Sequence, residues 1–216
     1  MDAKLGSAST TAGWSEALQA LARRGAQSRS PNGTRLITEG DLGDTLYIVQ
    51  SGRVKAFSTD ERGREITYGV YGPGEYLGEM SLDGGPRSAS VTTLEATVCS
   101  IVTRQTLREH IAEFPEFALE LVSRVIRRAR VATQSARNMA LLDVYGRVVQ
   151  LIDDLAEDQA DGTRIIAERL TQSDIAARVG CSREMVARLM KDLRDGGFIE
   201  TRGATMLLLK RLPAKW

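Results

Sequence analysis

The 216-residue sequence is poor in the residues on which many enzymes and metalloproteins depend, with one His, two Cys and only 5% aromatic residues. With only two cysteines, Cys99 and Cys181, the sequence excludes a disulfide framework, an iron–sulfur cluster and a cysteine-rich zinc site. We interpret both thiols as structural, and His110 as a surface or core residue without a chemical role. Because no Cys–His or Ser–His pair and no Walker loop is present, the sequence predicts a protein that is not an enzyme.

Long apolar runs are also missing. No stretch reaches the roughly 20 consecutive apolar residues that a membrane span needs, and the first residues lack the basic-then-apolar plan of a signal peptide. We therefore expect a cytoplasmic protein without a membrane partner. Its hydrophobic content of 42% is ordinary for a globular protein, and its length allows one large or two modest domains.

Proline and glycine are absent from residues 116–145, and together with Pro115 this interval predicts a helix over residues 115–142. Pro115 suits its first turn, and apolar residues then recur with alternating spacings of four and three. That spacing is typical of the seam of a two-stranded coiled coil, so we expect a homodimer. The residues expected at the dimer interface are Val122, Val125, Ala129, Ala132, Ala136 and Met139.

The same helix could instead lie on the core of its own domain, because Leu119, Leu121 and Ile126 form a second apolar stripe. We expect both contacts at once, with one stripe on the domain and the other on a second copy of the chain.

The N-terminal half predicts a β domain that follows a short amphipathic helix from Trp14 to Arg24. Beyond Pro31, short runs rich in β-forming residues are separated by glycines, which favours an antiparallel barrel or a jelly roll. Periodicity does not choose between these two. The expected strands cover residues 34–38, 45–50, 53–58, 65–71, 90–94 and 97–102.

Within this β domain, the segment from Gly78 to Ser90 has the chemistry of an anion site. Gly78 allows a ligand close to the backbone, and the residues after it can form one helical turn with free N–H groups. Arg87 can offer a phosphate two parallel donors, Ser88 adds a hydroxyl, and Glu79 can accept a hydrogen bond from a sugar. The alternative is an ion pair between Arg87 and Glu79 that holds a surface loop.

The C-terminal part carries the basic excess: from Thr163 onward, eleven Lys or Arg stand against six acids, which predicts a polyanionic partner. Residues 144–156 are expected to form an amphipathic helix, and the acidic residues 157–162 a solvated loop. Thr171 begins a Thr-x-x-Asp capping signature, and Gly180 breaks the helix that follows it.

Ser182 then caps a second helix over residues 183–195, so the pair predicts a helix-turn-helix. The first residues of this second helix would enter the major groove. There an Arg can form two hydrogen bonds with guanine, and a Glu can accept a hydrogen bond from cytosine. The alternative for these charges is a solvated helix face. A hairpin about Gly203 follows. The expected DNA contacts are Thr171, Ser182, Arg183, Glu184, Arg188, Lys191 and Arg202.

Residues 78–90 resemble the phosphate-binding cassette of cyclic-nucleotide-binding domains, and the chain from Pro31 to Arg211 looks like a member of the CRP/FNR family of bacterial regulators. The matching features include Gly40-Asp41, Gly52 and Pro73-Gly74-Glu75, and residues 180–188 resemble the family's recognition helix. The resemblance implies an α+β fold. Its parts would be a nucleotide-binding β-barrel or jelly roll (14–114), a dimerisation helix (115–142) and a winged helix-turn-helix (143–216).

By this resemblance, Gly78 and Glu79 would hold the ribose, and Arg87 and Ser88 the cyclic phosphate. Met80 and, on the long helix, Ala132 and Thr133 would complete the ligand site. The cassette is about one residue short between Glu79 and Arg87, and Ala132 stands where cyclic-AMP-responsive members have a hydroxyl. The effector therefore stays open between cyclic AMP and cyclic di-GMP, with no tightly bound cofactor.

The resemblance also implies the partners. They are double-stranded DNA with a palindromic site whose half-sites resemble TGTGA, a second copy of the chain, and RNA polymerase, with the protein at the nucleoid. Haem and iron–sulfur sensing, used by some relatives, find too few Cys and His. A competing interpretation is a ligand-independent regulator with a degenerate nucleotide pocket.

Overall fold

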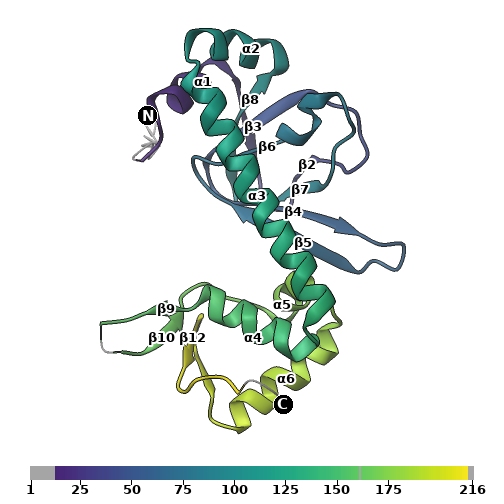
Figure 1. The fold of residues 1–216 in the computed structure, drawn as a ribbon, viewed down its shortest axis with the longest axis vertical. Helices are drawn as coiled ribbons and strands as arrows, with labels where there is room; N and C mark the ends of the chain where they lie inside the picture. The colour runs from purple at the N-terminus through teal and green to yellow at the C-terminus, as the bar shows by residue number, and fades with distance from the viewer. Residues whose placement is uncertain (1–12, 161, 214–216) are drawn as a thin grey trace, which may run out of the picture. The chain divides into compact units, whose positions relative to one another are not determined.

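The computed structural model describes residues 13–160 and 162–213. The chain divides into two compact units. The first comprises the residues up to Ser58 together with Thr67–Arg128, and the second comprises Thr59–Ile66 and the residues from Ala129 onward. One helix, α3 (Glu116–Leu141), belongs to both units, as Figure 1 shows. The helix predicted over residues 115–142 is thus confirmed.

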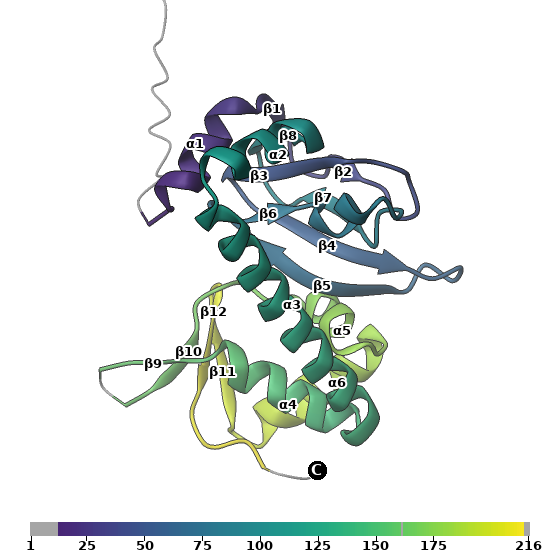
Figure 2. The same ribbon diagram turned by 45° about the horizontal axis from the view of Figure 1, so that its top comes forward.

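The first unit holds two four-stranded antiparallel sheets, in the strand orders β1-β8-β3-β6 and β2-β7-β4-β5. One core cluster joins Val49 and Cys99 from the first sheet to Val54 and Val91 from the second. The sheets therefore pack face to face as a jelly roll, which decides between the two predicted architectures. Figure 2 shows the labelled strands of the two sheets. Their bounds are β1 (Ala26–Ser30), β2 (Arg35–Ile37), β3 (Thr45–Ser51), β4 (Val54–Thr59), β5 (Glu65–Tyr71), β6 (Tyr76–Leu77), β7 (Ser90–Thr93) and β8 (Thr97–Thr103).

Two short helices, α1 (Glu16–Arg24) and α2 (Arg104–Glu113), share a second core with the first turns of α3. The α1 helix begins two residues after the predicted Trp14, because the Ser15 hydroxyl caps it by accepting a hydrogen bond from the Leu18 amide at 3.1 Å. The shared core contains Leu18 and Leu21 of α1, Leu107 of α2, Phe117 of α3, and Ile48, Tyr76 and Val102 of the sheet.

The predicted second stripe of α3 is wrong in two of its three residues. Leu121 packs against the core of the first unit, but Leu119 is 72% exposed and Ile126 is 47% exposed. Phe117, which is fully buried, anchors the helix in place of Leu119. A helix turns by 100° per residue, so Phe117 and Leu121 share one face, while Leu119 and Ile126 point away from it.

The second unit contains α4 (Val144–Leu155), α5 (Gln172–Val179) and α6 (Arg183–Asp195) with a small sheet in the strand order β11-β12-β10-β9. The helix predicted over residues 144–156 is confirmed to within one residue. The acidic segment is not a loop throughout, because two of its residues form a strand that pairs with β10. The strand bounds are β9 (Glu157–Asp158), β10 (Arg164–Ile166), β11 (Ile199–Arg202) and β12 (Thr205–Leu208).

The helix-turn-helix forms for the reasons that the sequence indicates. The Thr171 hydroxyl and the Asp174 carboxylate close a capping box at the start of α5. Gly180 has a φ of 69°, a left-handed conformation that suits glycine at a helix end, and Ser182 caps α6. Buried side chains of both helices, among them Ile175, Val179, Val186 and Leu193, join one core. Among the described residues, no helix is long and apolar enough to cross a membrane.

Candidate functional site

The predicted anion segment begins at Gly78, directly after β6. Gly78 has a φ of 90°, and a Cβ there would lie 2.5 Å from the Arg87 Nη1 and 2.6 Å from the Thr45 carbonyl oxygen. Only glycine fits this position. The predicted helical turn follows as the short 3₁₀ helix η1 (Glu79–Asp83).

Arg87 lies beneath this turn and is only 7% exposed. Its Nη1 donates to the carbonyl oxygens of Thr45 (2.9 Å) and Gly78 (3.1 Å) and to the Ser81 hydroxyl (2.9 Å). Its Nη2 donates to the Thr45 hydroxyl at 2.9 Å. All these acceptors are neutral, and no ion pair of the described residues includes Arg87. A buried guanidinium with only neutral partners lacks the negative charge that would balance its own.

Gly43 determines which side of Arg87 can meet that anion. A Cβ at Gly43 would lie 2.9 Å from Nε and 2.8 Å from Nη2 of Arg87. Any side chain there would therefore press on the edge of the guanidinium that presents two parallel N–H donors. The glycine leaves that edge free for a bidentate contact with phosphate oxygens.

Glu79 is 8% exposed, and its carboxylate pairs with the Arg128 Nη1 of α3 at 2.5 Å. The predicted alternative, an ion pair between Glu79 and Arg87, does not form. Arg128 also donates to the Tyr76 carbonyl oxygen at 2.5 Å and lies over the Tyr71 ring, 4.6 Å from its centroid. Our sequence interpretation missed Arg128. Arg128 thus holds the Oε1 oxygen of Glu79.

Ser88 and Met80 lie against each other at the edge of this segment. The Ser88 hydroxyl donates to the Met80 thioether at an Oγ–Sδ distance of 3.2 Å, and Met80 is 61% exposed. A thioether is a weak acceptor, so a phosphate oxygen can take over the Ser88 proton at little loss.

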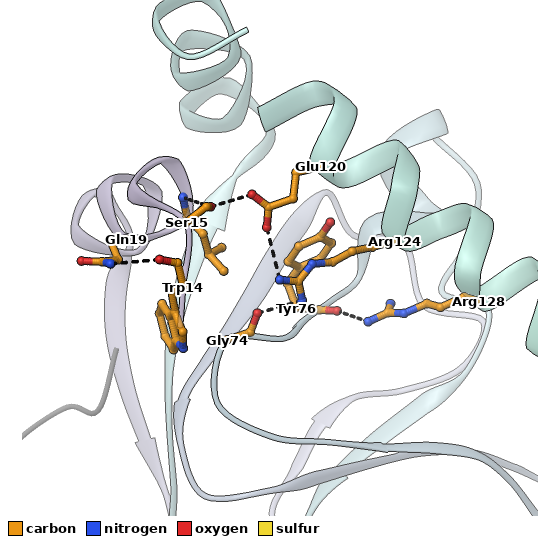
Figure 3. A network of polar contacts seen from close by, with 9 residues as sticks. Trp14, Ser15, Gln19, Gly74, Tyr76, Glu120, Arg124 and Arg128 are labelled. Carbon is orange, nitrogen blue, oxygen red and sulfur yellow. Dashed lines mark hydrogen bonds and ion pairs between the residues drawn. The ribbon is translucent and has the colours of Figure 1, made fainter. Parts of the chain in front are cut away.

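Three polar residues on one face of α3 attach this helix to its unit, as Figure 3 shows: Glu120 contacts Ser15, Arg124 the loop before β6, and Arg128 the strand β6. Arg124 donates to the Gly74 carbonyl oxygen at 2.9 Å and to Glu120 at 3.2 Å, and Glu120 accepts a hydrogen bond of 2.6 Å from the Ser15 hydroxyl. The spacing 120, 124, 128 is the sequence signal that could have found this face. Tyr76 lies beneath Arg124, and its burial raises the pKa of the phenol to about 12.

The predicted interface residues run along α3 from Val122 to Met139 and continue beyond this attachment. Thr133 and Ala132 belong to the second unit, and the Thr133 hydroxyl donates to the Ala129 carbonyl oxygen at 2.9 Å. This hydroxyl therefore enters any ligand contact mainly as an acceptor. All six residues of the predicted interface are exposed on the single chain: Val122, Val125, Ala129, Ala132, Ala136 and Met139.

The predicted DNA-reading residues lie together around the exposed first turns of α6. Ser182, Arg183, Glu184, Arg188 and Lys191 are all exposed. Hydrogen bonds from its own backbone N–H and from Ser182 hold the pKa of Glu184 below its usual value, so its carboxylate is ionised at neutral pH. Thr171 is exposed at the start of α5, where its hydroxyl belongs to the capping box.

Arg202, on the hairpin of β11 and β12, differs from the other predicted DNA contacts. Its guanidinium makes a two-pronged ion pair with Glu200, at 2.9 and 3.0 Å. A cavity of about 390 Å³ lies between this hairpin and the two helices, and its lining includes Arg169, Arg183 and Arg194. Arg169 and Arg194 are cations near the predicted DNA surface that sequence analysis did not single out.

The described residues contain no group of three or more His, Cys, Asp or Glu side chains that could hold a metal ion. Burial raises the pKa of the Cys99 thiol to about 11, and burial also raises the pKa of Cys181. Both thiols are therefore protonated at neutral pH.

Comparisons with known proteins agree with this arrangement. Family models of the cyclic nucleotide-binding domain and of the Crp-like helix-turn-helix domain match residues 28–114 and 146–214. A CRP-like cAMP-activated global transcriptional regulator of Mycobacterium tuberculosis is 35% identical over 182 residues, which cover 82% of this chain and 81% of that protein. The cAMP-activated global transcriptional regulator CRP of Salmonella typhimurium is 32% identical over 185 residues, covering 82% and 87%.

Among solved structures, the c-di-GMP responsive global regulator CLP of Xanthomonas campestris matches with a TM-score of 0.77 and 26% identity, covering 90% of this chain and 98% of that one. A cyclic nucleotide-binding domain together with a helix-turn-helix domain defines the protein as a DNA-binding transcription regulator. Within that class, the chain belongs to the CRP/FNR family.

Proposed function

We propose that this protein is a homodimeric, sequence-specific transcription regulator controlled by a cyclic nucleotide, either of the cyclic AMP type or cyclic di-GMP. The observation that carries the effector part is Arg87, which is buried and has only neutral partners. A phosphodiester supplies the missing negative charge. Gly78, Glu79, Met80 and Ser88 surround that position, with Ala132 and Thr133 proposed to approach the base.

The residues proposed to approach the base offer few polar groups that would select one nucleotide over another. Ala132 offers no hydrogen bond, and the Thr133 hydroxyl already donates within its helix. A site that makes few polar contacts with a base discriminates weakly between bases. The names of the Mycobacterium and Salmonella relatives mention cAMP, and that of CLP mentions c-di-GMP. Both nucleotides therefore belong in the proposal.

The homodimer is supported by the exposed apolar residues of α3. Val122, Val125 and Met139 are 49%, 40% and 44% exposed, and an unpartnered apolar stripe of this kind marks a protein interface. Two copies joined there would present two copies of α6 to a palindromic site with half-sites like TGTGA. The division into a nucleotide-binding domain (14–114), a dimerisation helix (115–142) and a DNA-binding domain (143–216) is part of this proposal.

In the proposed mechanism, the nucleotide binds one arrangement of the dimer better than the others and so raises its population. Only in that arrangement are the two recognition helices spaced for successive major grooves. RNA polymerase is the proposed downstream partner, and the cytoplasmic nucleoid is the proposed place of action.

The test combines isothermal titration of the purified protein against cyclic AMP, cyclic GMP and cyclic di-GMP with gel shifts on a TGTGA palindrome. We expect at least one of these nucleotides to bind and to raise the DNA affinity, and we expect Arg87→Ala to lose both effects. A ligand-independent regulator would instead bind the palindrome equally well with or without nucleotide, and Arg87→Ala would leave that affinity unchanged.

The dimer has its own test, because Val125→Glu and Ala132→Glu place charges in the proposed seam. We expect both variants to sediment as monomers and to lose most of their affinity for the palindrome. Dimeric, DNA-binding variants would contradict this interface.

A further inference from the structure

Met80 has an exposed thioether at the edge of the segment 78–90. The proposed function assigns no chemical reaction to this sulfur. Met80 is 61% exposed, whereas Met139 is 44% exposed and Met190 and Met206 are 4% and 6% exposed. The remaining described methionine, Met185, is half-buried. Oxidants in solution therefore reach the Met80 sulfur most easily among the methionines that the structure describes.

The two cysteines do not compete strongly for the same oxidants. The thiolate is the form of cysteine that reacts with peroxides. Cys99 is buried and its pKa is raised to about 11, and the pKa of Cys181 is also raised, so both side chains remain thiols at neutral pH. Among the described residues of the nucleotide-binding unit, the reactive sulfur is thus the thioether of Met80.

The contact with Ser88 gives oxidation at this sulfur a consequence. Ser88 has a single hydroxyl proton, which it donates to the Met80 Sδ at 3.2 Å. A sulfoxide places a strongly accepting oxygen on the same sulfur, one bond closer to that proton. The sulfoxide would hold the Ser88 proton much more firmly than the thioether does, and its oxygen would bring negative partial charge beside the anion site at Arg87.

We propose that Met80 is a reversible oxidation site whose sulfoxide withdraws the Ser88 hydroxyl from the ligand and so weakens binding of the phosphodiester. The oxidant is a hydroperoxide. Its terminal oxygen is transferred to the sulfur, which loses two electrons, and hydrogen peroxide leaves as water. A methionine sulfoxide reductase restores the thioether. The inference about ligand affinity rests on the proposed function, whereas the inference about preferential oxidation does not.

The first test is independent of any nucleotide. The full-length protein is treated with limiting hydrogen peroxide and digested, and sulfoxide at each methionine is followed by mass spectrometry. We expect the peptide with Met80 to be oxidised before those with Met139, Met185, Met190 and Met206. Equal or slower oxidation of Met80 overturns the proposal, whatever the protein binds.

The second test measures the ratio of nucleotide dissociation constants before and after oxidation, within each variant, by isothermal titration. Losing one hydrogen bond to a charged group predicts a weakening of about tenfold in the wild type. Met139→Leu should keep this ratio, and Met80→Leu should reduce it to one, whatever its own affinity is. Treatment with the reductase should return the oxidised wild type to its starting affinity.

Ser88→Ala separates the proposed route from general damage. Without the Ser88 proton, oxidation of Met80 should change affinity much less than in the wild type, while a local disruption would weaken both proteins equally and contradict the proposal. Circular dichroism of the oxidised proteins detects unfolding. If reduced wild-type protein binds none of the three nucleotides, the proposed function fails and the affinity part of this inference fails with it, while the peptide map still decides the oxidation order.

Discussion

Arg87 and Arg128 are two arginines of the same unit, and they are in opposite states. Arg87 is buried among neutral oxygens, with no carboxylate in the described contacts. Arg128 is committed to Glu79. The comparison separates two roles. Arg87 carries a charge that no carboxylate among its described contacts balances, whereas Arg128 balances a charge that the protein already contains.

The same contrast recurs in the second unit. Arg183 has no ion pair among the described residues, while Arg202 is bound to Glu200 through two hydrogen bonds. A cation without an internal partner can give its full charge to a phosphate or a base, and a paired cation must first give up a carboxylate. In both units, the unpaired arginine is therefore expected to contribute more to binding than the paired one.

The largest effect is expected from Arg87→Lys. Lysine keeps the charge but loses the two parallel donors of the Nε–Nη2 edge, so nucleotide affinity should fall about 100-fold. Isothermal titration measures this, and Arg29→Lys, on the exposed part of β1, is the matched control. An affinity within threefold of the wild type would mean that Arg87 is not the anion ligand.

Arg128→Gln should act on stability before it acts on binding. It leaves the buried carboxylate of Glu79 without a partner, and because Arg128 is itself partly exposed we expect a loss of about 2 kcal/mol in unfolding free energy. Urea denaturation gives the value. The neighbouring exposed Arg127→Gln is the control, and the double variant Glu79→Gln with Arg128→Gln should recover most of the loss. No recovery would show that Arg128 stabilises the helix by other contacts.

The prediction of these contacts from sequence was uneven, for physical reasons. Local signals located the junction of α5 and α6, since Gly180 ends α5 and Ser182 caps α6, and each acts within a few residues of itself. The ion pair between Glu79 and Arg128 spans 49 positions, and Arg128 lies in an arginine-rich stretch (124–130) whose charges are expected on the surface. No single-sequence pattern encodes a contact at that separation.

Two elements were also missed because their sequences lack an apolar period. β1 has the polar sequence AQSRS, and it exists because its backbone pairs with β8 along five residues. α2 buries only Leu107 and His110. In both cases tertiary contacts, which periodicity cannot reveal, decide the structure.

In the second unit, Arg183→Ala should weaken binding to the palindrome about tenfold and relax the base preference at one position, because it removes a possible bidentate contact with guanine. Arg202→Ala should weaken binding less than threefold, since Glu200 already engages that guanidinium. Gel shifts at several salt concentrations compare the two. An equal loss of affinity for both variants would show that the ion pair with Glu200 does not reduce the contribution of Arg202 to DNA binding.

The smallest effect concerns His110, a titratable group that the fold keeps uncharged. It is fully buried, stacked on Phe114 at 4.7 Å and edge-on to Phe117 at 5.2 Å. Burial, and then the nearby Arg24, hold its pKa below the usual value, while Glu113 and Glu116 oppose this shift. Below the ordinary histidine pKa of about 6.5, His110 therefore binds a proton in the unfolded chain more readily than in the folded chain.

Stability should accordingly be fully present above that pH and should decline as the pH falls below it. Between pH 7.5 and pH 5.5, we expect the part due to His110 to be at most about 1.4 kcal/mol, which is the limit for one proton bound one unit below pH 6.5. His110→Phe keeps an aromatic ring between Phe114 and Phe117 and has no proton to bind, so its unfolding free energy should fall less over the same range. Urea denaturation at the two pH values gives the difference, and parallel declines in both proteins would assign the pH dependence to other groups.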